Sequence, residues 1–136
     1  MKNSTVHYVQ KTFFIFFIVG MCCFTACKTV PTEIPSGITE AELLQLAQSS
    51  VDNNNTAAAK YYYNAVIATF GSNMSSLVVA EFELAHIDVK ANRYDEAKPI
   101  LERIISYYDD PELVAELPPE YKKLAQIDLE KCLENL

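Results

Sequence analysis

From residue 39 onward, hydrophobic residues recur at the three- and four-residue intervals of amphipathic helices. Thr39 and Glu42 have the spacing of a capping box, which predicts that a first helix begins there. Three asparagines at residues 53–55 end it, and Gly71 follows a second helix where a left-handed residue is usual. The pattern predicts an all-α domain of about five helices, at residues 39 to about 52, about 56–70, 75 to about 90, 94–108 and about 120–134.

The third predicted helix has two hydrophobic faces. A helix that is apolar on two sides must be covered on both, like the middle helix of a stacked array. One face comprises Val78, Phe82, Ala85 and Val89, and the other comprises Leu77, Ala80, Leu84, Ile87 and Ala91. The acidic residues of this helix, Glu81, Glu83 and Asp88, are expected to be solvated.

The hydrophobic pattern repeats at a shift of 38 residues. The paired positions are Leu44/Phe82, Leu46/Leu84, Ala47/Ala85, Val51/Val89, Ala59/Ala97, Tyr62/Ile100, Tyr63/Leu101, Val66/Ile104, Ile67/Ile105 and Phe70/Tyr108. A single helical hairpin cannot bury both sides of its inner helix, whereas stacked hairpins can. The repeat therefore favours a stack of antiparallel hairpins, with a bundle around one core as the alternative.

Each repeat resembles the tetratricopeptide repeat (TPR). The second matches at Leu84, Ala85, Tyr94, Ala97, Leu101 and Ile104, and the first at Leu46, Ala47, Ala59, Tyr63 and Val66. The resemblance implies a short TPR-like domain over residues 39–136, in which the first helix of each hairpin forms a concave wall. That wall would be a peptide groove made of Leu44, Gln48, Val51, Phe82, His86, Val89 and Lys90, with Lys122 and Gln126 from the last helix. The alternative is that the last helix or the N-terminal segment covers Leu44, Phe82 and Val89.

The N-terminus has the layout of a secretory signal. Lys2 and Lys11 precede an apolar run that begins at Phe13, and the run closes on the small residues Thr25 and Ala26. A membrane-spanning helix is the alternative, but the 14 residues 13–26 would reach only about 21 Å, against a hydrocarbon core of about 30 Å. We therefore predict that residues 1–26 are a signal peptide.

Phe24, Thr25, Ala26 and Cys27 resemble the lipobox of bacterial lipoproteins. The resemblance implies a diacylglyceryl group on the Cys27 sulfur, cleavage before Cys27, and attachment to a membrane facing the periplasm, with the outer membrane favoured. An ordinary signal cleaved after Ala26 is the alternative. Together with the repeats, this N-terminus resembles the periplasmic lipoproteins related to the TPR subunit of the outer-membrane β-barrel assembly machinery, which implies an interaction or assembly role.

Residues 27–38 are predicted to be a lipidated cysteine followed by a tether. Pro31 and Pro35 favour extended backbone, so the ten residues 28–37 would reach about 33 Å as a semi-stiff spacer or a disordered arm. Removal of Lys2 and Lys11 leaves nine basic and eighteen acidic side chains, a formal charge of −9. No basic cluster remains, so nucleic acid is not expected as a partner.

The sequence lacks the residue patterns of an enzyme or a metal site. His86 is the sole histidine after residue 26, and no glycine-rich phosphate loop or calcium-loop pattern is present, so we expect no catalytic activity, cofactor or metal. Cys132 is predicted to be a small buried hydrophobe. We expect an envelope protein–protein interaction module. The alternative is a ligand-binding accessory subunit of an envelope transport system, and an enclosed apolar pocket would favour it.

Overall fold

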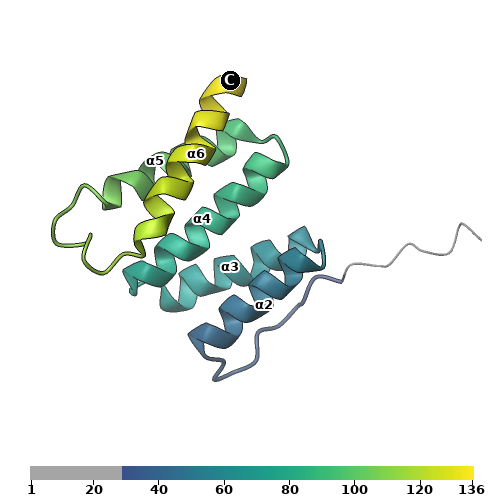
Figure 1. The fold of residues 1–136 in the computed structure, drawn as a ribbon. Helices are drawn as coiled ribbons and strands as arrows, with labels where there is room; N and C mark the ends of the chain where they lie inside the picture. The colour runs from purple at the N-terminus through teal and green to yellow at the C-terminus, as the bar shows by residue number, and fades with distance from the viewer. Residues whose placement is uncertain (1–28) are drawn as a thin grey trace, which may run out of the picture.

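The computed structural model describes residues 29–136, which contain five helices (Figure 1). They are α2 (Glu40–Asp52), α3 (Thr56–Phe70), α4 (Met74–Lys90), α5 (Tyr94–Tyr107) and α6 (Pro119–Asn135). Three short turns join the first four helices, and a longer connection, residues 108–118, leads to the last. No strand occurs in this range, so the described domain is all-α, as predicted. Within it, no helix combines the length and the apolar composition needed to cross a bilayer.

The predicted caps and turns set most helix ends. The Thr39 amide donates to Glu42 Oε2 at 2.9 Å and the Glu42 amide donates to Thr39 Oγ1 at 3.3 Å, which completes the capping box of α2. Asn54 and Asn92 adopt positive φ angles of 55° and 58° in the α2–α3 and α4–α5 turns. These two positions are equivalent under the 38-residue shift, so the repeat extends from the hydrophobic pattern to the backbone of the turns.

Two predicted helix ends are wrong in detail. Gly71 has a φ of −63° and is not left-handed. Glycine still fits this position, because a Cβ there would lie 2.4 Å from the carbonyl oxygen of Ile67. Helix α4 begins at Met74, just before Ser75, because the side chain of Asn73 accepts from the Ser75 amide at 3.1 Å and caps the helix one residue earlier.

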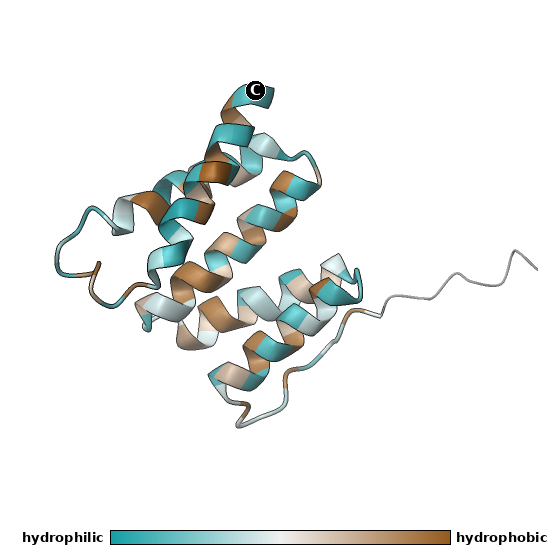
Figure 2. Ribbon diagram, viewed as in Figure 1, coloured by the Kyte–Doolittle hydropathy of each residue, from teal (hydrophilic) through white to brown (hydrophobic). Residues whose placement is uncertain are grey.

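The helices form two stacked hairpins and a closing helix. Helix α2 packs on α3, α4 packs on α3 and on α5, and α6 packs on both α5 and α4 (Figure 1). Figure 2 shows hydrophobic and hydrophilic segments alternating around the helices, as amphipathic packing requires. Helix α4 is therefore the middle helix of the stack.

Two separate hydrophobic cores lie on opposite sides of α4. Val78, Phe82, Ala85 and Val89 belong to the α4–α5–α6 core, whereas Ala80 and Ile87 belong to the α2–α3–α4 core. These are the two faces predicted from the sequence. A bundle would have one central core, so the stack is the correct architecture. The alanines that the 38-residue shift pairs, Ala47 with Ala85 and Ala59 with Ala97, are all 0% exposed.

Cys132 lies in the α4–α5–α6 core with no exposed surface. Burial raises the pKa of its thiol, which disfavours the reactive thiolate. The prediction of a buried, hydrophobe-like cysteine is confirmed.

Two carboxylates predicted to be solvated are buried instead. Glu81 is 8% exposed and accepts from Arg103 of α5 at 2.8 Å. Asp88 is 6% exposed and accepts from Lys60 Nζ of α3 at 2.5 Å and from Arg93 Nε at 2.8 Å. The sequence predicts a solvated position for both, because it shows a charge but not the partner that pairs with it. In the folded chain these ion pairs tie α4 to its neighbours on both sides.

The N-terminal segment is not a free spacer over residues 29–38. Asn55 Nδ2 donates to the Thr29 carbonyl at 3.0 Å, and Ile34 and Ile38 pack against the α2–α3–α4 core. The segment, which we call the docked arm, follows α2 from the α2–α3 turn to the start of α2 (Figure 1). These residues pack along α2 and do not extend away from it, because two isoleucines among the prolines and polar residues bury apolar surface against the helices.

Replacing the buried Asp88 should weaken the stack measurably. Asp88→Asn keeps the side-chain shape but removes the charge that Lys60 and Arg93 share, so we expect a loss of about 1–2 kcal/mol in the free energy of unfolding. Asp95→Asn, at an exposed position of α5, should change it by less than about 0.5 kcal/mol. Urea denaturation followed by circular dichroism measures both; equal effects of the two variants would contradict the role given to Asp88.

Candidate functional site

A groove of about 510 Å³ lies between α2 and α4, the first helices of the two hairpins, and the closing helix α6. We call it the α2/α4/α6 groove. It is lined by Gln48, Val51, Asn54, Thr56, Phe82, Glu83, His86, Ile87, Lys90, Ala91 and Leu124. Six of these eleven residues are polar or charged, so the groove offers hydrogen-bonding groups around an apolar base.

The structure brings five of the seven predicted groove residues together here: Gln48, Val51, Phe82, His86 and Lys90. The other two lie elsewhere. Leu44 packs against the α2–α3–α4 core, and Val89 is 1% exposed within the α4–α5–α6 core. The prediction for Val89 is wrong because its side of α4 is buried in the core that α4 forms with α5 and α6.

Helix α6 contributes Leu124 to the groove, and Lys122 and Gln126 are absent from its lining. Helix α6 turns Ala125, Asp128 and Cys132 inward, which leaves Leu124 facing the groove and 40% exposed. Lys122 instead pairs with Asp109 at 3.3 Å. Lys122 and Gln126 were expected in the groove by analogy with the first two repeats. That expectation is wrong because α6 packs through a different set of positions.

Phe82 forms the buried base of the groove. It is 4% exposed; its ring stacks on the His86 ring with centroids 5.6 Å apart and meets the Tyr121 ring edge-on at 5.3 Å. The alternative that α6 covers this position is therefore correct for Phe82. Phe82 supports the groove as part of the core, and it offers little surface to a ligand.

His86 is held in place by a carboxylate from α6. Its Nδ1 lies 2.6 Å from Oδ2 of Asp128, and the His86 side chain is 32% exposed. Asp128 is 7% exposed. The role of Asp128 was not predicted from the sequence, although an acidic residue between Ala125 and Cys132 on an inward helix face is itself a signal of a buried partner. The pair positions the imidazole in the groove wall and joins α4 to α6.

Two further charges lie in the groove. Burial raises the pKa of Glu83, and the nearby charges of His86 and Lys90 oppose that shift. Lys90 is exposed at the end of α4 and forms no ion pair within the described residues. The groove therefore presents an exposed cation near a carboxylate that is costly to ionise.

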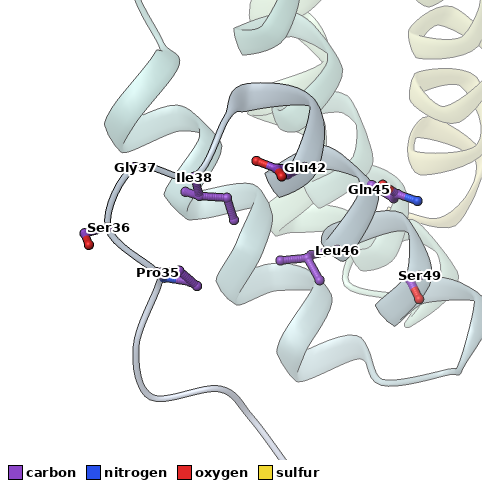
Figure 3. A pocket seen from close by; sticks show the side chains of 8 residues that line it. All are labelled: Pro35, Ser36, Gly37, Ile38, Glu42, Gln45, Leu46 and Ser49. Carbon is purple, nitrogen blue, oxygen red and sulfur yellow. The ribbon is translucent and has the colours of Figure 1, made fainter.

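A second, shallower depression of about 530 Å³ lies between the docked arm and α2. Figure 3 shows Pro35 and Ile38 of the arm on one side and Leu46 of α2 on the other. Gly37 makes the bend of the arm here with a φ of 81°. The depression lies between the arm and the helix on which the arm packs, so we regard it as a consequence of how the arm docks.

Within residues 29–136, no three His, Cys, Asp or Glu side chains are grouped so that they could hold a metal ion. Asp109, Asp110 and Glu112 lie in the α5–α6 connection, where Asp110 Oδ1 accepts from the Glu112 amide at 2.9 Å and closes a turn. The predicted signal peptide and the predicted lipidation residue Cys27 lie outside the described residues.

Comparison with known proteins identifies one similar chain from a bacterium. The sequence is 37% identical over 121 residues to a protein of Treponema pallidum (strain Nichols) that is described as an uncharacterized protein. The aligned region makes up 88% of this chain and 48% of that protein, so the chain spans about half the length of the curated relative it matches. No family model matches the chain. No solved structure matches it either.

Removing the charge of Glu83 should stabilise the protein near neutral pH. Its raised pKa means that the folded state holds the proton more tightly than the unfolded state. Ionised Glu83 therefore destabilises the folded state, and this effect is largest when the pH is above the pKa of Glu83 in the folded protein. Glu83→Gln should raise the melting temperature at pH 7, and the gain should shrink as the pH falls below the ordinary pKa of a glutamate, where the carboxyl becomes protonated in both states.

The control for this experiment is Glu116→Gln, at an exposed position in the α5–α6 connection. Its melting temperature should follow that of the parent protein across the same pH range. A Glu83→Gln variant that melts below the parent at pH 7 would show that ionised Glu83 stabilises the groove through His86 and Lys90.

Proposed function

We propose that this protein is an exported, lipid-anchored envelope protein whose helical domain binds a segment of another envelope protein in the α2/α4/α6 groove. The observation that carries the proposal is the groove itself, which lies between α2, α4 and α6 and combines an exposed leucine with an exposed lysine. A groove with an apolar base and a polar rim is suited to a peptide that presents one face.

The groove chemistry indicates what that segment should carry. Leu124 and Val51 offer apolar contact, and Lys90 offers a cation that a carboxylate of the partner would neutralise. Gln48 and Thr56 lie along the α2–α3 side and can exchange hydrogen bonds with a peptide backbone. The expected ligand is a peptide with an apolar side chain a few residues from an acidic one.

Export and anchoring are supported by the N-terminal sequence. The basic start, the apolar run and the small residues before Cys27 have the order of a lipoprotein signal, and Cys27 is the proposed site of the lipid. The proposed location is the periplasmic face of a bacterial membrane, with the outer membrane favoured. The TPR-like relationship is likewise proposed; its support is the 38-residue repeat, the hairpin order and a groove on the first helices.

A ligand-binding subunit for a transport system is the second candidate. The groove volume of about 510 Å³ falls within the range of small-molecule sites, and this observation favours a ligand-binding subunit. The polar majority among the lining residues suits a peptide backbone better than a wholly hydrophobic small molecule. We therefore place peptide binding first.

A negative charge introduced into the groove should strongly reduce partner capture. Phe82 is unsuitable for this test because its burial makes any substitution there a test of folding. Leu124→Glu and Lys90→Glu change surface atoms, and each should reduce the recovery of crosslinked envelope partners by about tenfold or more, the effect of losing about 1.4 kcal/mol of binding energy. Tagged protein, crosslinked in the envelope and analysed by quantitative mass spectrometry, provides the measurement.

Helix α6 offers a matched control for each of the two variants. Leu133 is 57% exposed and Lys123 is also exposed, and neither lines the groove. Leu133→Glu and Lys123→Glu should leave the captured partners unchanged. If the controls lose the same partners, or if the groove variants keep them, the groove is not the binding site.

The anchor has its own test. Cys27→Ser should block incorporation of labelled fatty acid and should move the protein from the membrane fraction to the soluble fraction, because the thiol that would carry the lipid is gone. Cys132→Ser leaves the proposed anchor intact and should stay with the membrane. Retention of the Cys27→Ser variant in the membrane would refute lipid anchoring.

A further inference from the structure

The docked arm changes where the chain enters the domain. If residues 28–38 were a free spacer, the first fixed residue would be Thr39, at the start of α2. Instead Thr29 is held at the α2–α3 turn by its hydrogen bond from Asn55, and Ile34 and Ile38 bury apolar surface behind it. The chain therefore meets the folded domain at the α2–α3 turn, at the opposite end of α2 (Figure 1).

The distance from this entry point to the proposed lipid is short. Cys27 precedes Thr29 by two residues, which reach at most about 7 Å when fully extended. That is less than the diameter of one helix with its side chains, about 10–12 Å. A domain attached in this way cannot stand far from the membrane or turn its other end toward it without detaching the arm.

We infer that the α2–α3 turn is the edge of the domain that faces the bilayer, and that the groove partner is a protein segment held at the membrane surface. This inference rests on the lipid anchor proposed above. Asn54 and Thr56 line the groove and flank Asn55, which binds Thr29, so one end of the groove opens where the anchored chain leaves the domain.

The α4–α5 turn lies on the same side of the molecule as the α2–α3 turn (Figure 1). Lys90 and Ala91 line the groove just before that turn. The cation of the groove thus also lies toward the membrane-facing side. A segment that reaches Lys90 comes from a protein that is itself at the bilayer surface, such as the juxtamembrane part of a membrane protein or of another lipoprotein.

Fluorescence quenching by the bilayer tests the orientation. Ala57→Cys places a thiol in the first turn of α3, beside the α2–α3 turn, and Ser72→Cys places one beyond the other end of α3. Helix α3 has 15 residues, so the two probes are about 22 Å apart along its axis. Cys132 is buried and its thiol pKa is raised, so a maleimide dye labels the introduced cysteine.

The lipidated full-length mature protein is reconstituted in phosphatidylethanolamine and phosphatidylglycerol vesicles that contain a lipid with a nitroxide head group. The dye at position 57 should be quenched several-fold more than the dye at position 72. Equal quenching, or stronger quenching at position 72, would overturn the orientation. If the protein remains bound to the vesicles in that case, the lipid anchor itself stands.

A linker insertion tests whether the short connection between Cys27 and Thr29 is the cause of the difference in quenching. Ten Gly and Ser residues inserted between Lys28 and Thr29 add about 16–19 Å of average span. This variant should stay on the vesicles and lose the difference between the two probes. If the difference persists, the short connection does not set the orientation. If the parent protein does not bind vesicles, the anchor and the orientation both fail.

Discussion

The two hydrophobic faces of α4 are the constraint on which the rest of this structure depends. A helix with one apolar stripe can lie at the surface of a domain, but α4 must be covered on both sides to remain out of water. The α2–α3 hairpin supplies one cover, and α5 with α6 supplies the other. The order of the stack follows from this requirement, because each cover comes from the chain segment directly before or after α4.

The groove is a geometric result of the same arrangement. Helices α2, α4 and α6 come from three successive units, and their side chains meet where the two cores adjoin. Its polar residues are held by contacts that also stabilise the stack, as the pairing of His86 with Asp128 shows. Binding and stability therefore share side chains, and only peripheral residues such as Leu124 and Lys90 are available to a ligand without cost to the core.

Much of the fold was predictable from the sequence because its signals are local. The Thr39–Glu42 cap, the asparagine turns and the two faces of α4 each depend on residues within a few turns of one another. The exceptions depend on distant partners. Asp128 lies 42 residues from His86, Lys60 lies 28 residues from Asp88, and Asn55 lies 26 residues from Thr29. A single sequence contains no direct record of such pairs, so the partners of the buried carboxylates and the docking of the arm could not be identified from it.

The use of one helix by two cores also determines how the domain can come apart. If the α2–α3 hairpin opens, one face of α4 is exposed while α5 and α6 still cover the other. The two cores are therefore coupled through α4, which belongs to both. Adjacent units of repeat proteins are coupled in the same way, through the contacts between neighbours. A ligand that contacts α2, α4 and α6 at once would link the two units a second time, so binding would increase the cooperativity of unfolding as well as the stability.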